Sequence, residues 1–233
     1  MKSFSCAAFL SLLANPAVAA EAFDPGGYLN AQAAKSDWAP LAIELPKAMF
    51  AGTPKDLHTP NLEEITGKAR KPFLAPPGVK NLALGKPVTA DDTPQLGDLE
   101  QLTDGDKEGS DGSFIELPAG AQYAQIDLGE TCELHAILFW HYHAEARVYF
   151  DVVVRMADDP DFIMGAKTLF NNDHDNSAGL GVGKDKEYIE TNEGRLVDAA
   201  GVKTRYVRLY SKGNTSNDLN HYIEIEVFGK DRE

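Results

Sequence analysis

The 233-residue sequence has only two cysteines, and this shortage excludes one common way of stabilising an exported protein. Cys6 lies in a stretch that we expect to be cleaved, so Cys132 would be alone and no intrachain disulfide could form. A domain of this size can bury enough apolar surface to fold without one. Cys132 directly precedes the apolar run 134–139, so we expect a buried and inert thiol.

Basic residues are also scarce, with 22 Lys and Arg against 36 Asp and Glu, a formal net charge of −14 at pH 7. A surface of this sign repels nucleic-acid phosphates and anionic lipids, and no basic stripe in the sequence offsets it. The composition therefore argues against nucleic acid as a partner and against binding to an anionic membrane. It is compatible with neutral sugars and with bound Ca²⁺.

Apolar runs of the 18 or more residues that a membrane helix needs are missing. Residues 4–13 form a shorter, mostly apolar run that follows Lys2 and precedes the small residues 17–20. This arrangement predicts a secretory signal peptide over residues 1–20, cleaved after Ala20 or Ala19. We therefore expect an exported protein, periplasmic or extracellular, that does not insert into a membrane.

Catalytic motifs are missing as well. The sequence contains no G-x-S-x-G or H-E-x-x-H motif, and no cysteine nucleophile with a plausible partner. Carboxylates are so numerous that choosing two of them as a glycosidase pair would be arbitrary. We therefore predict no catalytic residues and a protein that is not an enzyme.

The sequence beyond the signal peptide divides into two parts. Residues 21–80 are rich in proline, including Pro76-Pro77-Gly78, and show no sustained period of 2 or 3.6. We predict an extended segment there, which partly lies along the surface of the following domain. Residues 81–230 have the short strands and frequent turns of an all-β domain rather than alternating βαβ units.

Alternating and apolar segments give the expected strands of this domain. Residues 123–128 place Ala124, Ile126 and Leu128 on one face, and residues 134–140 form a continuous apolar run. We also expect strands over 148–156, which is rich in Val, Tyr and Phe, and over 204–210. In the last strand the predicted inward residues are Ile223, Ile225 and Val227, and the predicted outward residues are Glu224, Glu226 and Phe228.

Five segments of the sequence together carry a family resemblance: 81–90, 102–106, 123–129, 204–210 and 222–229. They resemble the discoidin family, also called coagulation factor V/VIII type C domains. The resemblance covers about two thirds of the chain and implies a galactose-binding-like, jelly-roll β-sandwich that follows a mostly irregular N-terminal extension. It also implies binding, often of a sugar, rather than catalysis.

The loop that begins Asp104-Gly105-Asp106 suggests a calcium site, because a hard cation needs converging oxygens and a tight turn. It is not an EF-hand, since Ile115 stands at the twelfth position. The resemblance implies a structural Ca²⁺ held by this loop and by a Glu of the last strand, which nominates Asp104, Asp106 and Glu224. The alternative is an ordinary Asp-Gly turn with solvated side chains.

The candidate ligand site begins at His141. If residues 140–147 form a strand, His141, His143, Glu145 and Arg147 share one side of it. These side chains could hydrogen-bond sugar hydroxyls beside the aromatic face of a Trp or Tyr. Alternatively, the two histidines could bind Zn²⁺ or Cu²⁺ with ligands from elsewhere, or the whole stretch could be structural.

Two further polar segments are candidate sites. The stretch 170–184 is rich in Asn, Asp and Gly and too long for a simple hairpin, and its Asp173, Asp175 and Asn176 could hold a second cation. The stretch 214–222 contributes Asn214 and His221. Its polar side chains could cap a turn, or line one composite site with His143 and Arg147.

These observations lead to one expected function and two alternatives. We expect a non-catalytic exported module that recognises carbohydrate or a glycan-bearing component of the envelope or matrix. Its ligand contacts would be His141, His143, Glu145 and Arg147, helped by Asn214 or His221. The first alternative is a protein-interaction module of the cell envelope. The second is a metal-binding protein or metal-dependent enzyme that uses His141 and His143.

Overall fold

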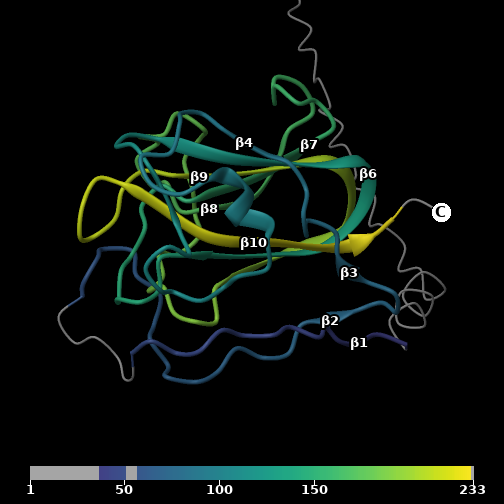
Figure 1. Cartoon of the computed structure of the whole chain (residues 1–233), viewed down its shortest axis with the longest axis horizontal. Coiled ribbons are helices and arrows are strands. Elements are labelled where there is room, and N and C mark those ends of the chain that lie inside the picture. Colours follow the sequence, from purple (N-terminus) through teal and green to yellow (C-terminus); the bar gives the residue numbers. More distant parts are fainter. Residues whose placement is uncertain (1–36, 51–56, 232–233) are drawn as a thin grey trace, which may run out of the picture. The chain divides into compact units, whose positions relative to one another are not determined.

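The computed structural model of the chain describes residues 37–50 and 57–231 (Figure 1). The predicted signal peptide, residues 1–20, and the first part of the predicted extension, residues 21–36, lie outside the described residues. Within the described ranges, no helix is both long and apolar enough to cross a bilayer. The elements are β1 (Ala39–Pro40), β2 (Leu74–Ala75), β3 (Lys80–Asn81), β4 (Val88–Ala90), the 3₁₀ helix η1 (Leu99–Thr103), β5 (Ile115–Leu117), β6 (Gln122–His141), β7 (Val153–Ala157), β8 (Lys167–Asn171), β9 (Arg195–Ser211) and β10 (Asn220–Lys230).

Strand β6 is long enough to serve both layers of the fold. Its first half pairs with β4 and with the second half of β9, and its second half pairs with β10 and with the first half of β9. The pairing with β9 is irregular between Asp127 and Cys132, where the ribbon bends (Figure 1). The sheet therefore runs β3-β10-β6-β9-β7-β8 and folds over on itself, with antiparallel pairing throughout. The predicted β-sandwich is confirmed.

The main core lies between the two layers. Ala124, Ile126 and Leu128 of β6 are buried there, as their alternation predicted, together with Val207 and Leu209 of β9. Alternate side chains of a strand point to opposite faces, so one face of each half-strand fills this space. Burial of such aliphatic side chains contributes about 1.5–3 kcal/mol each and holds the layers together.

A second apolar cluster lies on the outer face of the layer that contains β10, and the N-terminal extension covers it. Leu41, Ile43, Phe73 and Val79 of the extension pack against this cluster. The buried members of the sheet face are Ala136, Leu138, Trp140, Ile223 and Phe228. From Trp38 onward the extension is therefore part of the same compact unit as the sandwich.

Two expectations about the strands are wrong. Residues 148–152 are not part of a strand, because Asp151 has a φ of 50° and the chain there bonds to the 213–215 turn instead. The apolar content of this segment reflects burial at one end of the sandwich. In β10 a register shift between Tyr222 and Glu224 turns Ile223 to the outer cluster, while Ile225 and Val227 face the main core as predicted.

The predicted outward residues of β10 are also buried. Glu224 is completely inaccessible, Glu226 is 6% exposed and Phe228 is 5% exposed. They do point away from the main core, but further chain covers that face. Lys107, from the loop between η1 and β5, pairs with Glu226 at 2.9 Å. For Glu224, Glu226 and Phe228 the predicted face of the strand is correct, but the sequence did not predict that further chain covers this face.

Cys132 is buried, as expected. Its side chain is 3% exposed, and the thiol donates to the carbonyl of Glu130 at 3.5 Å. Burial raises the pKa of this thiol, and the neighbouring Glu130 and Asp231 raise it further. A higher pKa lowers the thiolate fraction at neutral pH, so the group is less reactive than an exposed cysteine.

Gly194, which directly precedes β9, lies where the chain packs closely on the outer face. It has a φ of 60°, and a Cβ atom there would lie 2.7 Å from the carbonyl oxygen of Phe139 and from the Trp140 ring. Gly85 has a φ of 67° and no atom within 4 Å of such a Cβ. We expect Gly85→Ala to lower the free energy of unfolding by about 1–2 kcal/mol, from backbone strain alone. Gly194→Ala should lower it by about 3–5 kcal/mol, because the clash adds to the strain.

Urea denaturation of the two variants measures this difference, because each transition gives a free energy of unfolding in water. Equal losses in both variants would show that the outer face accommodates a methyl group at Gly194. That result would contradict the close packing of Trp140 against the chain before β9.

Candidate functional site

The predicted ligand residues do not lie on one strand. Strand β6 ends at His141, and residues 142–147 form an irregular connection across the end of the sandwich. The expectation that His141, His143, Glu145 and Arg147 share one side of a strand is therefore wrong. The connection crosses this end beside the start of β10, because Tyr222 pairs with His141.

His141 is part of the interior. Its side chain is completely inaccessible, and its Nδ1 donates to the carboxylate of Glu190, which is equally buried, at 2.7 Å. The ring stacks on Tyr149 with centroids 4.2 Å apart. A buried polar group needs a hydrogen-bond partner, so this contact stabilises both side chains within the core.

His143 holds a neighbouring loop in place. Its side chain is also inaccessible, and its Nε2 hydrogen-bonds the carbonyl of Lys107 at 2.9 Å. Gly109 packs against this ring, since a Cβ there would lie 3.1 Å from it. His143 therefore attaches the 104–112 loop, which contains the predicted calcium ligands, to the end of the sandwich.

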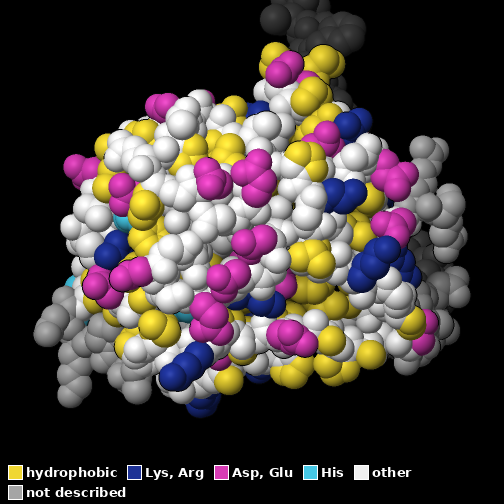
Figure 2. Space-filling model, in the orientation of Figure 1, with side chains coloured by type: hydrophobic (Ala, Val, Ile, Leu, Met, Phe, Trp, Pro, Cys, Tyr) yellow, Lys and Arg dark blue, Asp and Glu magenta, His cyan; other side chains and the backbone are white. Residues whose placement is uncertain are grey.

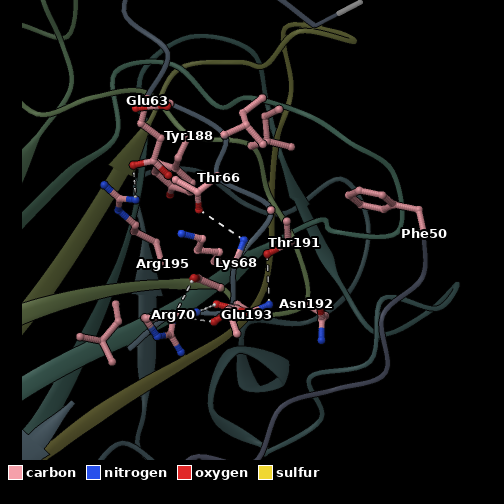
Figure 3. Close-up of a pocket in the computed structure, with 17 residues that line it drawn as sticks. Phe50, Glu63, Thr66, Lys68, Arg70, Tyr188, Thr191, Asn192, Glu193 and Arg195 are labelled. Atoms are coloured by element: carbon pink, nitrogen blue, oxygen red, sulfur yellow. Dashed lines mark hydrogen bonds and ion pairs between the residues drawn. The ribbon is translucent and has the colours of Figure 1, made fainter. Parts of the chain in front are cut away.

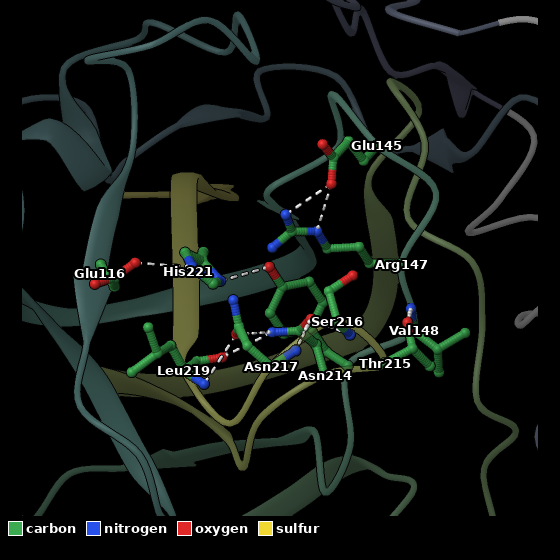
Figure 4. Close-up of polar contacts among 11 residues, drawn as sticks. Glu116, Glu145, Arg147, Val148, Asn214, Thr215, Ser216, Asn217, Leu219 and His221 are labelled. Atoms are coloured by element: carbon green, nitrogen blue, oxygen red, sulfur yellow. Dashed lines mark hydrogen bonds and ion pairs between the residues drawn. The ribbon is translucent and has the colours of Figure 1, made fainter.

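Arg147 and Glu145 reach the surface at this end (Figure 4). The Arg147 guanidinium donates to Glu145 at 2.8 Å and lies 4.7 Å from the centre of the Tyr142 ring. The Glu145 side chain is 62% exposed and that of Arg147 is 12% exposed. Stacking on an aromatic ring and pairing with a carboxylate fix the orientation of the guanidinium.

His221 lies next to Arg147 and links it to β5. Burial lowers the pKa of His221, and the neighbouring Arg147 lowers it further, so the ring is neutral at pH 7. Burial raises the pKa of the Tyr149 hydroxyl, which therefore stays protonated and donates to Nδ1 of His221 at 3.0 Å. The other ring nitrogen then donates to Glu116 at 3.1 Å.

Asn214 is mainly a turn residue. Its Nδ2 donates to the Asn217 side chain at 2.8 Å and to the Leu219 carbonyl at 2.9 Å. The turn is held against the Arg147 segment, because the Val148 amide donates to the Thr215 hydroxyl at 3.1 Å (Figure 4). We call this end of the sandwich, formed by residues 142–149 and 214–221, the rim. Its members include five of the six predicted ligand residues, and the sixth, His141, is buried beneath it.

The sequence did not point to three residues that organise the rim. Glu116 and Phe114 come from the short segment at β5, where Glu116 accepts from His221 and Phe114 makes an edge contact with Tyr142 at 4.9 Å. Glu190 lies in a stretch without regular structure. Nothing in the local sequence marks any of them, because each depends on chain segments brought together by the sandwich.

The predicted calcium residues divide into two kinds. Glu224 is completely buried, and no side chain of the described residues hydrogen-bonds its carboxylate, although the Gly105 amide lies close enough to lower its pKa. Burial raises the pKa of this carboxyl to about 9, and the charge of the nearby Asp104 contributes to the rise. Such a buried, unpaired carboxylate beside a second carboxylate is the donor set that a hard cation prefers.

Asp106, in contrast, folds its own loop. One oxygen accepts from the Glu108 amide at 2.9 Å and the other from the Ser113 hydroxyl at 2.8 Å. Asp104 also accepts one bond, from the Asp106 amide at 2.8 Å. Asp104 and Glu224 therefore fit a calcium site, and Asp106 shapes the turn beside it.

The acidic residues of the 170–184 loop also approach one another. Carboxylate oxygens of Asp151, Asp173 and Asp175 lie within 4.8 Å of each other, and Asp151 was not expected from the sequence. Both oxygens of Asp173 accept backbone bonds from this loop, and Lys212 lies 4.0 Å from Asp151. The predicted Asn176 instead accepts from the Gly181 amide. These groups cap and close the loop.

The metal alternative for His141 and His143 has no support in the described part of the chain. Neither histidine belongs to a group of three His, Cys, Asp or Glu residues that could hold an ion there. Each one has instead a hydrogen-bond partner from a different segment, Glu190 or Lys107.

Comparison with known proteins gives structural likeness only. No protein-family model and no curated protein matches this sequence. Among solved structures, a region of the enzyme CpGH89 from Clostridium perfringens, in complex with GlcNAc-α-1,4-galactose, matches with a TM-score of 0.50 and 19% identity. That match covers 65% of this chain and 15% of the enzyme chain.

Smaller structures show the same likeness. A CBM32 of AlyQ in complex with 4,5-unsaturated mannuronic acid has 20% identity and a TM-score of 0.44, and the match covers 61% of this chain and 93% of that one. A fucose binding module from Streptococcus pneumoniae has 18% identity and a TM-score of 0.46, with 64% and 96% covered. At these identities the likeness concerns the fold. The chain has the galactose-binding-like, discoidin-type β-sandwich fold that its sequence segments suggested.

Proposed function

We propose that this protein is an exported, non-catalytic carbohydrate-binding module and that the rim is its sugar site. The observation that carries the proposal is the fixed Arg147 guanidinium, held by Tyr142 and Glu145 at the loop end of the sandwich. Convergent polar groups beside an aromatic surface are what a sugar ring requires, because each hydroxyl needs a directed hydrogen bond. GlcNAc-α-1,4-galactose, the sugar in the C. perfringens enzyme structure, is a natural first probe.

The exposed members of the rim give the proposed contacts. The Arg147 guanidinium has five N–H groups, more than its contacts with Glu145 and Tyr149 use, and can donate to neighbouring hydroxyls, while Glu145 can accept from them. Thr215, Ser216 and Asn217 are exposed beside them and offer further donors and acceptors. His141 and His143 support this surface from below rather than contact the sugar.

The arrangement favours binding over catalysis. Both nitrogens of His221 are engaged, by Tyr149 and by Glu116, so this histidine is not positioned to take a proton from a substrate. Arg147 is likewise paired with Glu145. Titratable groups that already have hydrogen-bond partners keep a fixed orientation, and such a site is suited to binding a ligand rather than to transferring protons.

One observation favours the alternative of a protein-interaction module. Ile163 and Met164 are 81% and 74% exposed on the loop between β7 and β8, which projects at the top of Figure 1 and carries hydrophobic and acidic side chains in Figure 2. Asp159 fixes this loop by accepting from the amides of both residues. An ordered apolar tip of this kind is suited to contact with a protein partner.

We further propose that Asp104 and Glu224 bind a structural Ca²⁺. The proposal rests on the buried Glu224 carboxylate, which has no side-chain partner among the described residues and has a second carboxylate nearby. The cation would neutralise both carboxylates and fix the 104–112 loop, which His143 attaches to the rim. Calcium would therefore stabilise the fold and take no part in chemistry.

Replacing Arg147 tests the sugar site. We expect Arg147→Ala in the mature chain to weaken binding of GlcNAc-α-1,4-galactose by about tenfold or more, because hydrogen bonds from a charged donor are lost. The thermal midpoint should change little, since the side chain contacts mainly Tyr142 and Glu145. Isothermal titration calorimetry and thermal denaturation measure the two quantities.

Arg205→Ala is the matched control, because Arg205 also pairs with a carboxylate, Asp127, but near the bend of β6 at the other end of the sandwich. Its affinity should equal that of the native protein. Equal affinity in all three proteins would remove the rim as the site. Failure of a glycan array to show any binding, together with a partner captured only when Ile163 and Met164 are intact, would favour the protein-interaction alternative.

Calcium is tested by thermal denaturation with Ca²⁺ or with a chelator. At a Ca²⁺ concentration about 100 times its Kd, binding should stabilise the native protein by about 2.7 kcal/mol. For a chain of this size that is a rise in Tm of about 5–10 °C. We expect Glu224→Gln to abolish the rise and Glu108→Gln to keep it, because Glu108 is exposed on the same loop.

The calcium proposal fails if the native protein shows no rise in Tm. It also fails if the Glu224→Gln variant responds to Ca²⁺ as the native protein does. Neither outcome bears on the sugar site, which is measured by binding alone.

A further inference from the structure

A cleft of about 430 Å³ lies between two extended segments on the outer side of the sandwich and shares no lining residue with the rim (Figure 3). One wall is residues 63–70 of the N-terminal extension, and the other is residues 188–196, which lead into β9. Its size falls within the range of about 300–1,000 Å³ that is usual for small-ligand sites.

The two walls are attached to each other at both ends, and an ion pair between Arg195 and Glu63 also joins them. At one end the segments pair in parallel, and the Glu63 amide donates to the Glu187 carbonyl at 2.8 Å. At the other end the Arg70 guanidinium donates to the carbonyls of Glu193 and Gly194 at 2.8 and 3.1 Å. The Arg70 amide also donates to the Glu193 carboxylate at 2.9 Å. The cleft is the space between these two fixed points.

Arg195 gives one wall a fixed, cationic surface. Its guanidinium lies 4.4 Å from the centre of the Tyr188 ring and donates to Glu63 at 3.0 Å (Figure 3). This leaves guanidinium N–H groups of Arg195 without an acceptor, and the same holds for Arg70. Burial lowers the pKa of Arg70, and the nearby Arg195 also lowers it, so the two cations lie close enough to affect each other.

Lys68 provides a third positive charge, and it is unpaired. Its side chain lies between those of Arg195 and Arg70 in the view of Figure 3. In the parts of the chain that the structure describes, its ammonium group has neither an ion pair nor a hydrogen bond. Arg195 is paired with Glu63 and Arg70 lies beside Glu193, so Lys68 is the cation of the cleft that an anionic group of a ligand would neutralise.

The neighbouring side chains indicate what else that ligand must contain. The hydroxyls of Thr66 and Thr191 each accept one backbone bond, which leaves their O–H groups free to donate. Asn192 uses its Nδ2 to hold the Pro46 carbonyl, which leaves its side-chain oxygen as an acceptor. These groups suit a ligand with several hydroxyls. The carboxylates of Glu63, Glu64 and Glu193 in the same walls oppose a doubly charged anion such as phosphate.

We propose that this cleft is a second ligand site, for a saccharide that carries one carboxylate, such as a uronic acid, and that Lys68 binds the carboxylate. Arg70 and Arg195 position the two walls and add donors, and Thr66, Thr191 and Asn192 bind hydroxyls. The site is independent of the rim, since the two share no residue.

The test is calorimetric titration of the mature chain with glucuronate, glucose and inorganic phosphate. Glucuronate and glucose share a ring and differ in the carboxylate, so their comparison isolates the charge. We expect saturable binding of glucuronate and at least about tenfold weaker binding of glucose, because the charge-assisted bond is lost. Lys68→Met should weaken glucuronate binding by a similar factor.

Lys71→Met is the matched control, because Lys71 is an exposed lysine of the same segment that does not line the cleft. It should bind glucuronate as the native protein does, and so should Arg147→Ala at the rim. Thermal midpoints of the variants show whether each is folded, and amide chemical shifts of Thr66, Thr191 and Gly194 should move on titration.

Several outcomes overturn the proposal. They are no saturable binding of glucuronate, unchanged binding by Lys68→Met, equal binding of glucose, or tighter binding of phosphate than of glucuronate. If Arg147→Ala abolishes glucuronate binding and Lys68→Met does not, the acidic sugar binds at the rim. That result would overturn the cleft as a site and leave the proposed function in place.

Discussion

Strands β6 and β9 pair with each other on both sides of a shared bend, and this long pairing positions the two layers of the sandwich. Because the two strands stay hydrogen-bonded before and after the bend, each contributes to both layers. Both termini of each strand therefore lie at the same end of the sandwich, opposite the bend. The connection after His141 and the turn before Asn220 both lie at this end. These two segments are far apart in sequence, and together they form the rim.

The N-terminal extension adds a second level of organisation. It has little regular structure, with only two-residue strands β1 and β2, yet it covers the apolar outer face of the β10 layer. Its side chains supply burial, and its attachment at separated points leaves the cleft open between them. Figure 2 shows acidic side chains scattered over the face in view, whereas in the cleft the three cations are matched by the carboxylates of Glu63, Glu64 and Glu193.

The sequence predicted well those features that depend on local pattern. The alternation of Ala124, Ile126 and Leu128 predicted their burial, because one layer covers one face of the strand. The segment around Val148 was misread, since its apolar residues are buried by a loop end rather than by strand pairing. Ile223 was placed on the wrong face because a bulge reverses the alternation, and a bulge has no reliable local signature.

The site was predictable only in part, for the same reason. Arg147 and Glu145 were expected to be near one another and are paired. The burial of His141 was not foreseeable, because its partner Glu190 is 49 residues away. Likewise, the unpaired state of Glu224 depends on how the 104–112 loop and the outer face are covered. Long-range contacts decide which polar residues face solvent, and a single sequence does not record them.

The covered outer face also determines where the chain can be divided. Residues 81–230 contain every strand of the sandwich except the first residue of β3, and family resemblance alone would make Lys80 the natural point of dissection. A fragment cut there would leave Leu138, Trp140 and Phe228 facing water, without Leu41, Ile43 and Phe73 above them. Such an apolar surface favours self-association. The smallest unit that stays soluble therefore begins near Trp38, and the irregular extension belongs to the domain.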